Sequence, residues 1–130
     1  MLMELKVIFL LKTKAEVFKR RVKWILIADS TKTLSDKIPM NRVTVFNVDG
    51  YAICIGKNKN GLFAAKNKCP HEGYSFKGGW CTDDNKFVCP VHRYGFDVLT
   101  GRGGGTYVNI YKIEERESGV FVGIEFTSLF

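Results

Sequence analysis

The sequence predicts an all-β domain, an antiparallel β-sandwich with two inserted loops and a short helical extension at its N-terminus. Many short apolar segments are separated by turn residues, a pattern typical of a sandwich or a small barrel. Two stretches, 69–80 and 89–105, are instead rich in glycine, proline, cysteine and histidine. They are expected to be loops on the sheet scaffold, where chemistry usually lies.

The first 23 residues differ from the rest of the chain. Residues 1–23 contain seven Lys/Arg and two Glu, a net charge of +5, whereas residues 24–130 contain thirteen basic and eleven acidic residues. We therefore predict a basic N-terminal extension over 1–23 and one domain over 24–130. A helix docked on the domain or a simple extension is favoured, and a helix resting on a membrane surface is the alternative. Apolar residues recur there at helical steps of three and four: Val7, Leu11, Ala15, Phe18 and Val22.

Seven strands are expected after this extension, with a polar stretch over 29–37. Asp49-Gly50 and Asn60-Gly61 are two-residue hairpin signals, and Ser118-Gly119 joins the last two strands. We find no internal repeat. The expected strands are Trp24–Ala28, Val43–Val48, Tyr51–Ile55, Leu62–Ala65, Lys86–Cys89, Val108–Ile113 and Val120–Glu125.

The overall composition excludes several classes of protein. The formal net charge of +7 is concentrated in the extension, so the domain is not expected to bind nucleic acid. The apolar run Val7–Leu11 is shorter than the roughly 7–15 residues of an export signal. No run approaches the ~20 apolar residues of a membrane span. We therefore expect a cytoplasmic protein without membrane partners, whose thiols are free wherever no metal binds them.

One pattern of cysteines and histidines suggests metal chemistry. It reads Cys69-Pro70-His71, then seventeen residues, then Cys89-Pro90-Val91-His92. Two thiolates and two imidazoles suit either tetrahedral zinc or a mixed iron–sulfur centre. Zinc fingers usually pair Cys with Cys and His with His, whereas here each loop is mixed. A two-iron cluster explains the mixing, because one iron can take both cysteines and the other both histidines.

The remaining cysteines fall outside this pattern. Cys54 lies in an expected strand and Cys81 follows Trp80, so both are expected to be small buried apolar residues. His71 and His92 are the only histidines of the chain, and both fall within the pattern. Coincidence is a poor explanation for that placement.

The pattern resembles the motif of the Rieske [2Fe–2S] family, C-x-H followed by C-x2-H. The resemblance extends to neighbouring glycine, proline and aromatic positions and covers roughly residues 24–125. It implies one [2Fe–2S] cluster per chain, with Cys69 and Cys89 on the inner iron and His71 and His92 on the outer iron. The neighbouring positions that match are Gly73, Gly78-Gly79, Pro90, Phe96-Asp97 and Thr100-Gly101.

Departures from the family's patterns narrow the function. High-potential members resemble C-T-H-L-G-C and C-P-C-H and join their extra cysteines in a disulfide, but here those positions are Tyr74 and Val91. An oxygenase's mononuclear iron would need further histidines. The resemblance then implies a Rieske-type ferredoxin, an electron-transfer protein rather than an enzyme, that donates to an oxygenase or reductase. The alternatives are the small Rieske subunit of a nitrite reductase and a zinc-binding or cluster-sensing protein. We expect no catalytic residues.

The redox potential is expected at the low end of the family's range. In high-potential relatives the second histidine is followed by a segment resembling G-S-x-Y, whose hydroxyls donate to the cluster. This chain has Phe96 at the tyrosine position and Tyr94 at the serine position. Rieske potentials span about −150 to +300 mV, so the loss of two donors predicts a value near or below about 0 mV. A cation at Arg93 would push the value upward.

Overall fold

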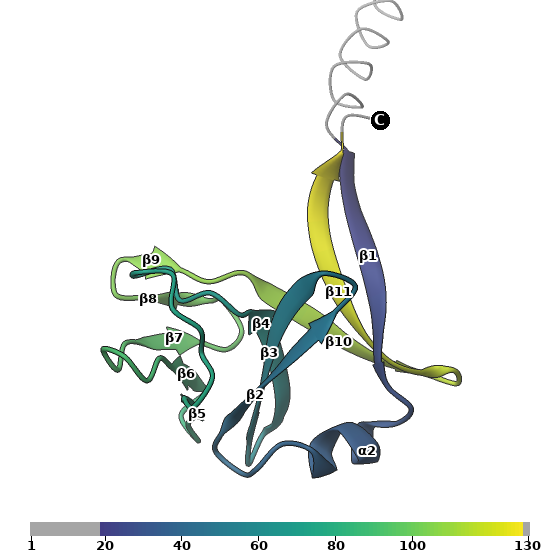
Figure 1. Cartoon of the computed structure of the whole chain (residues 1–130), viewed down its shortest axis with the longest axis horizontal. Helices are drawn as coiled ribbons and strands as arrows, with labels where there is room; N and C mark the ends of the chain where they lie inside the picture. Colours follow the sequence, from purple (N-terminus) through teal and green to yellow (C-terminus); the bar gives the residue numbers. More distant parts are fainter. Residues whose placement is uncertain (1–18, 129–130) are drawn as a thin grey trace, which may run out of the picture. The chain divides into compact units, whose positions relative to one another are not determined.

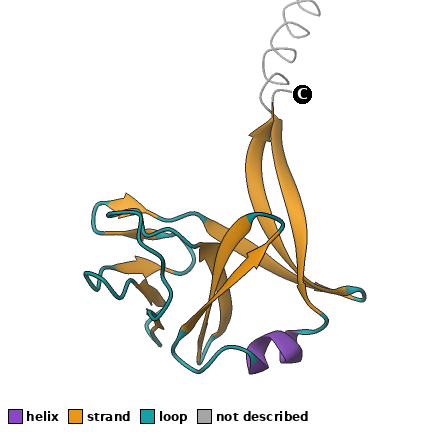
Figure 2. Ribbon diagram, viewed as in Figure 1, coloured by secondary structure: helices purple, strands orange, loops and turns teal. Residues whose placement is uncertain are grey.

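The computed structural model describes residues 19–128. Within this range, residues 24–123 form one compact unit, and residues 19–23 and 124–128 belong to a second one. The described part is mostly strand with one short helix (Figures 1 and 2), which confirms the predicted all-β class. No helix among the described residues is long and apolar enough to cross a membrane.

The first described segment corrects part of the predicted helix. Strand β1 covers Lys19–Ala28, so Val22 lies in a strand and not on a helical face. The other residues of the expected helix lie outside the described residues. The sheet order places β1 beside β11 (Gly119–Ser128), which satisfies its backbone groups by pairing. Pairing with a neighbouring strand overrides a weak local helical pattern.

The main sheet has six strands in the order β1-β11-β10-β4-β3-β2. Its other strands are β2 (Val43–Val48), β3 (Tyr51–Asn58), β4 (Gly61–Lys66) and β10 (Ile110–Arg116). The pairings of β2 with β3, β3 with β4, β4 with β10 and β10 with β11 are all antiparallel. The sandwich expected from the sequence is thus built around one six-stranded sheet, in which the segment between β4 and β10 carries the loop region.

The hairpin turns test the predicted turn signals. Asp49 and Gly50 both have positive φ, 52° and 79°, as a two-residue type I′ turn requires. The other two turns lie one residue earlier than predicted. Asn58 pairs with Gly61, and Arg116 pairs with Gly119, so each of these glycines begins a strand instead of lying in its turn.

The short helix α2 (Thr31–Asp36) lies within the polar stretch that the sequence analysis left without an element. The hydroxyl of Ser30 accepts a hydrogen bond from the Thr33 N–H at 3.1 Å and caps the helix. Only Leu34 of the helix is buried. A single apolar residue gives no helical periodicity, which is why the pattern did not predict it.

Two small sheets carry the loop region and lie to the left of strands β2–β4 in Figure 1. One has the order β5-β6-β7, and the other pairs β8 with β9. The sequence predicted only β6 among them, because two- and three-residue strands leave almost no pattern. Their bounds are β5 (Trp80–Cys81), β6 (Lys86–Val88), β7 (Gly95–Asp97), β8 (Arg102–Gly103) and β9 (Thr106–Tyr107).

An aromatic core lies where this region packs together. The ring of Phe76 lies 6.1 Å from that of Phe87 and 5.9 Å from that of Phe96, and all three side chains are fully buried. Cys54 and Cys81 belong to the same cluster, are fully buried and form no disulfide. This confirms the expectation that both are small buried residues of the core. Burial raises the pKa of the Cys81 thiol to about 12, so this thiol stays neutral.

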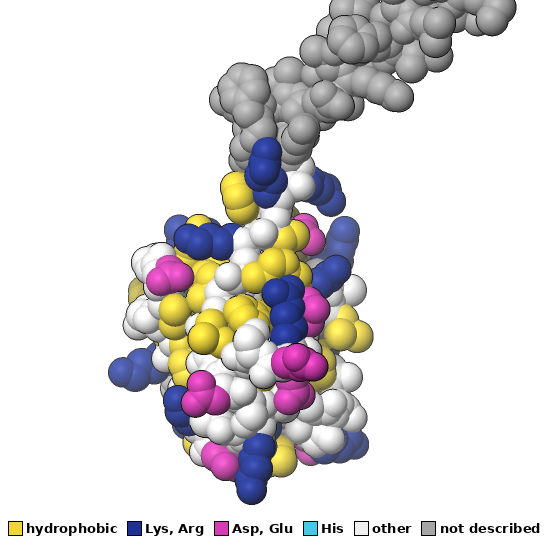
Figure 3. All heavy atoms as spheres, turned by 90° about the vertical axis from the view of Figure 1, so that its right-hand side faces the viewer, with side chains coloured by type: hydrophobic (Ala, Val, Ile, Leu, Met, Phe, Trp, Pro, Cys, Tyr) yellow, Lys and Arg dark blue, Asp and Glu magenta, His cyan; other side chains and the backbone are white. Residues whose placement is uncertain are grey.

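Another face of the molecule carries a mixed surface (Figure 3). Apolar side chains gather there among basic and acidic ones, and no histidine is visible in this view. The guanidinium of Arg116 lies 4.6 Å from the Trp24 ring and 4.9 Å from the Phe121 ring, within cation–π range of both. Arg116 therefore covers part of the apolar surface that these two rings present.

Candidate metal centre

The two predicted loops have the same backbone frame. In the first, the Cys69 N–H donates to the Tyr74 carbonyl and the Gly73 N–H donates to the Cys69 carbonyl, both at 2.7 Å. In the second, the Cys89 N–H donates to the Tyr94 carbonyl at 3.0 Å, and the Arg93 N–H donates to the Cys89 carbonyl at 2.9 Å. In each case the same two backbone hydrogen bonds close a loop of six residues, 69–74 and 89–94.

The shared frame corresponds to a short repeat that the sequence analysis missed. Residues 69–76 read CPHEGYSF and residues 89–96 read CPVHRYGF, which share the pattern C-P-x3-Y-x-F. Gly73 and Arg93 are equivalent in this alignment, and both have positive φ, 79° and 60°. Comparing the chain with itself at an offset of twenty residues would have found the repeat.

The loops bring the four predicted ligands together in two layers. Cys69 and Cys89, at the first position of each frame, are buried, with 2% and 1% of their surface exposed. Both histidines are exposed, and their ring centroids lie 5.4 Å apart. The thiols form an inner pair and the imidazoles an outer pair.

The Cys69 thiol also interacts with its surroundings. Burial raises its pKa, and the neighbouring Cys89 thiol raises it further. The backbone N–H groups of His71 and Glu72 act in the opposite direction, because they donate toward this sulfur and favour a thiolate. The loop therefore presents hydrogen-bond donors to a sulfur that is otherwise shielded from water.

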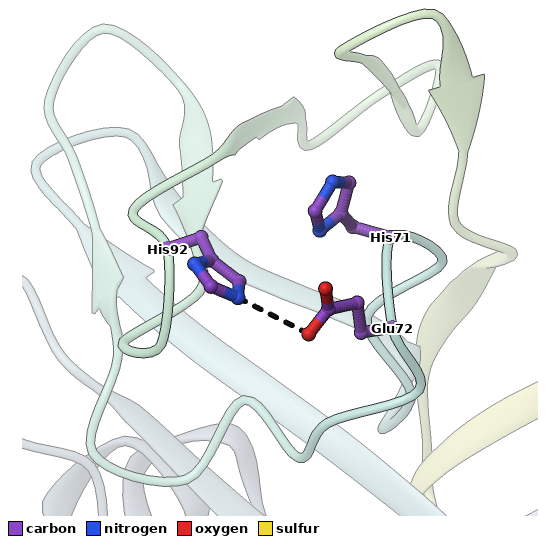
Figure 4. A group of neighbouring side chains, drawn as sticks. All are labelled: His71, Glu72 and His92. Carbon is purple, nitrogen blue, oxygen red and sulfur yellow. Dashed lines mark hydrogen bonds and ion pairs between the residues drawn. The ribbon is translucent and has the colours of Figure 1, made fainter.

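The two histidines have different neighbours. The ring of His71 lies against that of Tyr94, with centroids 4.3 Å apart and an interplanar angle of 36°. His92 instead contacts a carboxylate, since its Nε2 lies 3.1 Å from Oε2 of Glu72. Figure 4 shows the Glu72 side chain directed toward His92. Sequence analysis did not single out Glu72, although it directly follows a predicted ligand.

A different set of donors also meets at this surface. The side chains of His71, Glu72 and His92 each offer one ligand atom, and these atoms lie within 4.8 Å of one another. Two imidazoles and a carboxylate could hold a single metal ion at the surface. This alternative leaves the buried thiols unused, so the part played by the cysteines distinguishes the two kinds of site.

Comparison with known proteins identifies the domain. Residues 23–108 match the model of the Rieske [2Fe–2S] domain. The chain belongs to the Rieske [2Fe–2S] domain family. The cofactor expected from the sequence is thus the one that this family binds.

Individual relatives of this Rieske domain include electron-transfer components. The chain is 30% identical over 59 residues to the ferredoxin component of the alkene monooxygenase system of Xanthobacter autotrophicus. That match covers 45% of this chain and 48% of the relative, so the chain spans about half the length of the curated relative it matches.

Solved structures share the fold. The ferredoxin of carbazole 1,9a-dioxygenase from Nocardioides aromaticivorans is similar with a TM-score of 0.59 and 22% identity, over 75% of this chain and 92% of that one. A chain described as an NADH-dependent nitrite reductase small subunit from Mycobacterium tuberculosis gives a TM-score of 0.64 at 17% identity. That likeness covers 80% of this chain and 96% of the subunit.

The residues present in this Rieske domain fit a [2Fe–2S] group. Soft thiolates and imidazoles are the ligands that Rieske centres use. Both cysteines are buried and both histidines exposed, so one iron could take the two thiolates and the other the two imidazoles. The loops also approach each other closely, because a side chain at Gly79 would collide with the Val88 and Phe76 carbonyl oxygens. Glycine is therefore required where this loop passes the other.

Different contacts support the two Rieske loops. The second loop extends directly from paired strands, since Val88 pairs with Gly95 and Phe87 pairs with Phe96. The first loop has no such strand pair. There the Asn67 side chain accepts from the Phe76 N–H at 2.8 Å and exchanges hydrogen bonds with the Ser75 hydroxyl. Asn67 occupies the place in the repeat that Phe87 has in the second loop.

The cation beside the second histidine is also located. The Arg93 guanidinium lies 5.6 Å from the centre of the Trp80 ring, and that of Arg42 lies 5.2 Å from the same ring. Trp80 thus offers both guanidinium groups a cation–π contact. A cation at Arg93 was expected to raise the redox potential, and the contact with Trp80 fixes where this cation lies.

Proposed function

We propose that this protein is a Rieske-type ferredoxin, a one-electron carrier whose [2Fe–2S] cluster is held by Cys69, His71, Cys89 and His92. The observation that carries the proposal is the layered donor set, with two buried thiols and two exposed imidazoles on matching loops. Such a set favours a two-iron centre over the surface trio, because the trio gives the buried cysteines no role.

The residues around the donor set have separate tasks in this proposal. Phe76, Phe87 and Phe96 keep water from the inner side of the loops, since all three are fully buried. In this proposal, electrons pass between the cluster and a docked protein through the exposed histidine rings. When bound, the cluster supplies reversible one-electron transfer. No proton transfer or bond-making by the chain is required, so we propose no catalytic residue and no enzymatic activity of its own.

Exposed aromatic and aliphatic side chains near the histidines suit a protein partner. Tyr74, Val91 and Tyr94 are 47%, 45% and 39% exposed. Tyr94 contacts His71, and the ring of Tyr74 lies 6.4 Å from that of His92. Aromatic residues are enriched in interface cores. We propose that this rim docks a reductase that donates electrons and an oxygenase or reductase that accepts them.

A second candidate is the small Rieske subunit of a larger enzyme such as a nitrite reductase. The likeness to the nitrite reductase subunit, with a TM-score of 0.64, favours keeping it. Copurification of a large partner subunit would support this candidate over a free carrier. A zinc-binding or cluster-sensing role is the third candidate, and zinc would leave the protein colourless. A cytoplasmic location accompanies each of these proposals.

Metal analysis and visible spectroscopy test the proposal. The purified protein should be red-brown and contain two irons and two sulfides per chain, without stoichiometric zinc. The reduced protein should give the electron paramagnetic resonance signal of a Rieske centre, and a mixture with a reductase should show it being reduced. A folded, colourless protein with one zinc ion would contradict the proposal. So would a single iron that survives in the Cys69→Ser, Cys89→Ser double variant.

We also propose that residues 24–130 contain everything needed to hold the cluster. The family match begins at residue 23, and both loops lie far downstream of it. Because β1 starts at Lys19, removal of residues 1–18 should leave a folded, red-brown protein. Removal of residues 1–22 also deletes the start of β1, so a lower melting temperature is expected. Loss of the cluster in the shorter deletion would show that the extension belongs to the domain.

A further inference from the structure

The carboxylate of Glu72 is the closest charged group to either histidine among the printed contacts of the described chain. Its Oε2 lies 3.1 Å from Nε2 of His92, and both side chains are about half exposed, at 48% and 46%. An ionised carboxylate can only accept hydrogen bonds. The proton of this contact therefore sits on Nε2, and in a neutral imidazole Nδ1 then carries the lone pair that a metal ligand needs.

This contact follows from the shape of the two loops. Glu72 and His92 are the fourth residues of their respective frames, CPHE and CPVH. Equivalent positions of two similar loops project in corresponding ways, and here the two side chains meet (Figure 4). The third positions are His71 and Val91. The histidine of the first loop is thus displaced by one residue, and a carboxylate takes the place where a second fourth-position histidine would be.

The other histidine has no comparable acceptor among its printed contacts. His71 contacts the rings of Tyr94 and His92. Its carboxylate neighbour Glu72 is directed to His92, as Figure 4 shows. The two imidazoles therefore differ in their partners: Nε2 of His92 contacts a carboxylate, whereas the ring of His71 contacts a tyrosine ring.

We infer that Glu72 is a positioning residue that fixes the Nε2–H tautomer of His92 and lowers the redox potential of the centre. The inference rests on the proposed ligand set. A carboxylate that accepts from a ligating histidine orients the ring and makes it a stronger donor. A stronger donor stabilises the oxidised state, and the negative charge of Glu72 opposes the electron that reduction adds. Both effects have the same sign.

The inference adds a cause of low potential to those expected from the sequence. The earlier expectation was based on missing donors at Tyr94 and Phe96, which leave the reduced state less stabilised. Glu72 acts on the other redox state, from the outer side and through one histidine. Its contribution is therefore separable, because a substitution changes only the side chain and keeps the backbone N–H of residue 72 that donates toward the Cys69 sulfur.

Protein-film voltammetry of three variants at one fixed neutral pH tests the inference. Glu72→Gln keeps the size of the side chain and removes its charge. Its potential should rise by an amount equal to about a tenfold shift toward the reduced form, which is about 59 mV for a one-electron couple. Glu72→Asp restores the charge and should return the potential toward the wild-type value. Glu117→Gln, in the β10–β11 turn, makes the same charge change and should leave the potential unaltered.

A second measurement distinguishes the effect of the direct hydrogen bond from the long-range electrostatic effect of the Glu72 charge. Added salt screens exposed charges over about 10 Å at 0.1 M and less at higher concentration. The difference between wild type and Glu72→Gln should persist at high salt, since it acts through a direct hydrogen bond. Nitrogen resonances of the two histidines, resolved by pulsed electron paramagnetic resonance, should be unequal in the wild type and more alike in Glu72→Gln.

The outcomes distinguish this inference from the proposed function. A wild-type protein without a Rieske spectrum overturns the ligand set and the inference together. A normal spectrum with an unchanged or lowered potential in Glu72→Gln overturns the inference alone. An equal rise in Glu117→Gln would also overturn it, because the effect would then reflect net charge. If Glu72→Gln fails to load its cluster, an unchanged nitrogen spectrum and potential in Glu72→Ala would overturn it equally.

Discussion

The two cluster loops share a backbone but differ in what supports them and in where their histidines lie. Loop 69–74 is held by hydrogen bonds to the side chain of Asn67, whereas loop 89–94 extends from the paired strands β6 and β7. The first places its histidine third in the frame and the second places it fourth. Equal frames explain why the thiols lie together in the interior. The displacement explains why one histidine meets a carboxylate and the other meets a tyrosine.

The comparison teaches that backbone geometry and ligand geometry are set separately. The frame needs a cysteine whose N–H and carbonyl close the loop and a residue of positive φ at its fifth position. Neither requirement involves a histidine. The side chains at the third and fourth positions can therefore differ between the loops without changing the fold.

The largest expected effect comes from breaking the position that both loops share. Cys69→Ser and Cys89→Ser should each abolish the cluster, because each removes one thiolate of the inner pair. Iron and sulfide analysis should show complete loss, and the melting temperature should fall since metal binding contributes folding free energy. Cys81→Ser, an equally buried cysteine outside the frames, should stay red-brown. Loss of the cluster in that variant alone would mean that the ligands are wrongly assigned.

The next largest effect is expected from the histidines, which lie at the third position of the first loop and the fourth position of the second. His71→Ala and His92→Ala should each abolish the Rieske electron paramagnetic resonance signal, because one nitrogen of the outer pair is lost. The double variant Val91→His, His92→Val moves the second histidine to the third position and keeps the composition. It should also lose the signal, since neighbouring positions direct their side chains differently. A normal signal in this variant would show that the displacement has no role.

The unequal supports predict a smaller effect. Asn67→Ala removes the acceptor of the Phe76 N–H and the contacts with Ser75. An unpaired buried group costs about 1–3 kcal/mol, so the free energy of unfolding should fall by that amount in denaturant titrations. Cluster loss on dilution should also become faster. Asn47→Ala, at an exposed site in β2, is the matched control and should have little effect. Equal effects of both changes would contradict the proposed support.

The smallest effect concerns the fifth position of each frame. Gly73→Ala has room, since its nearest contact would be Lys68 Cε at 3.4 Å, and it should cost only the strain of positive φ. That strain is about 1–2 kcal/mol. Arg93→Gly relieves the same strain but loses the contact with Trp80, so its stability should stay within about 1 kcal/mol of the wild type. Denaturant titration measures both. A more costly Arg93→Gly than Gly73→Ala would reverse the comparison.

Much of the fold could be predicted from local sequence patterns, which do not depend on residues far away in the chain. Val43–Val48 alternates and ends at Asp49-Gly50, and its strand and turn are as expected. The four cysteine and histidine positions could be proposed as ligands because the chemistry of a Rieske centre imposes the spacing of its ligands. Cys54 and Cys81 could be set aside as buried residues for the same reason, since they lie outside that spacing.

The sequence by itself determined the all-β class, most strands of the main sheet and the candidate ligands. Only the tertiary structure decided that Lys19–Lys23 is strand, because its neighbour β11 comes from the far end of the chain. The contact between Glu72 and His92 and the support by Asn67 were likewise decided in space. Such contacts join residues many positions apart through exposed or irregular segments. Local periodicity cannot predict such contacts, because it indicates only which face of a helix or strand is buried and not which side chains touch.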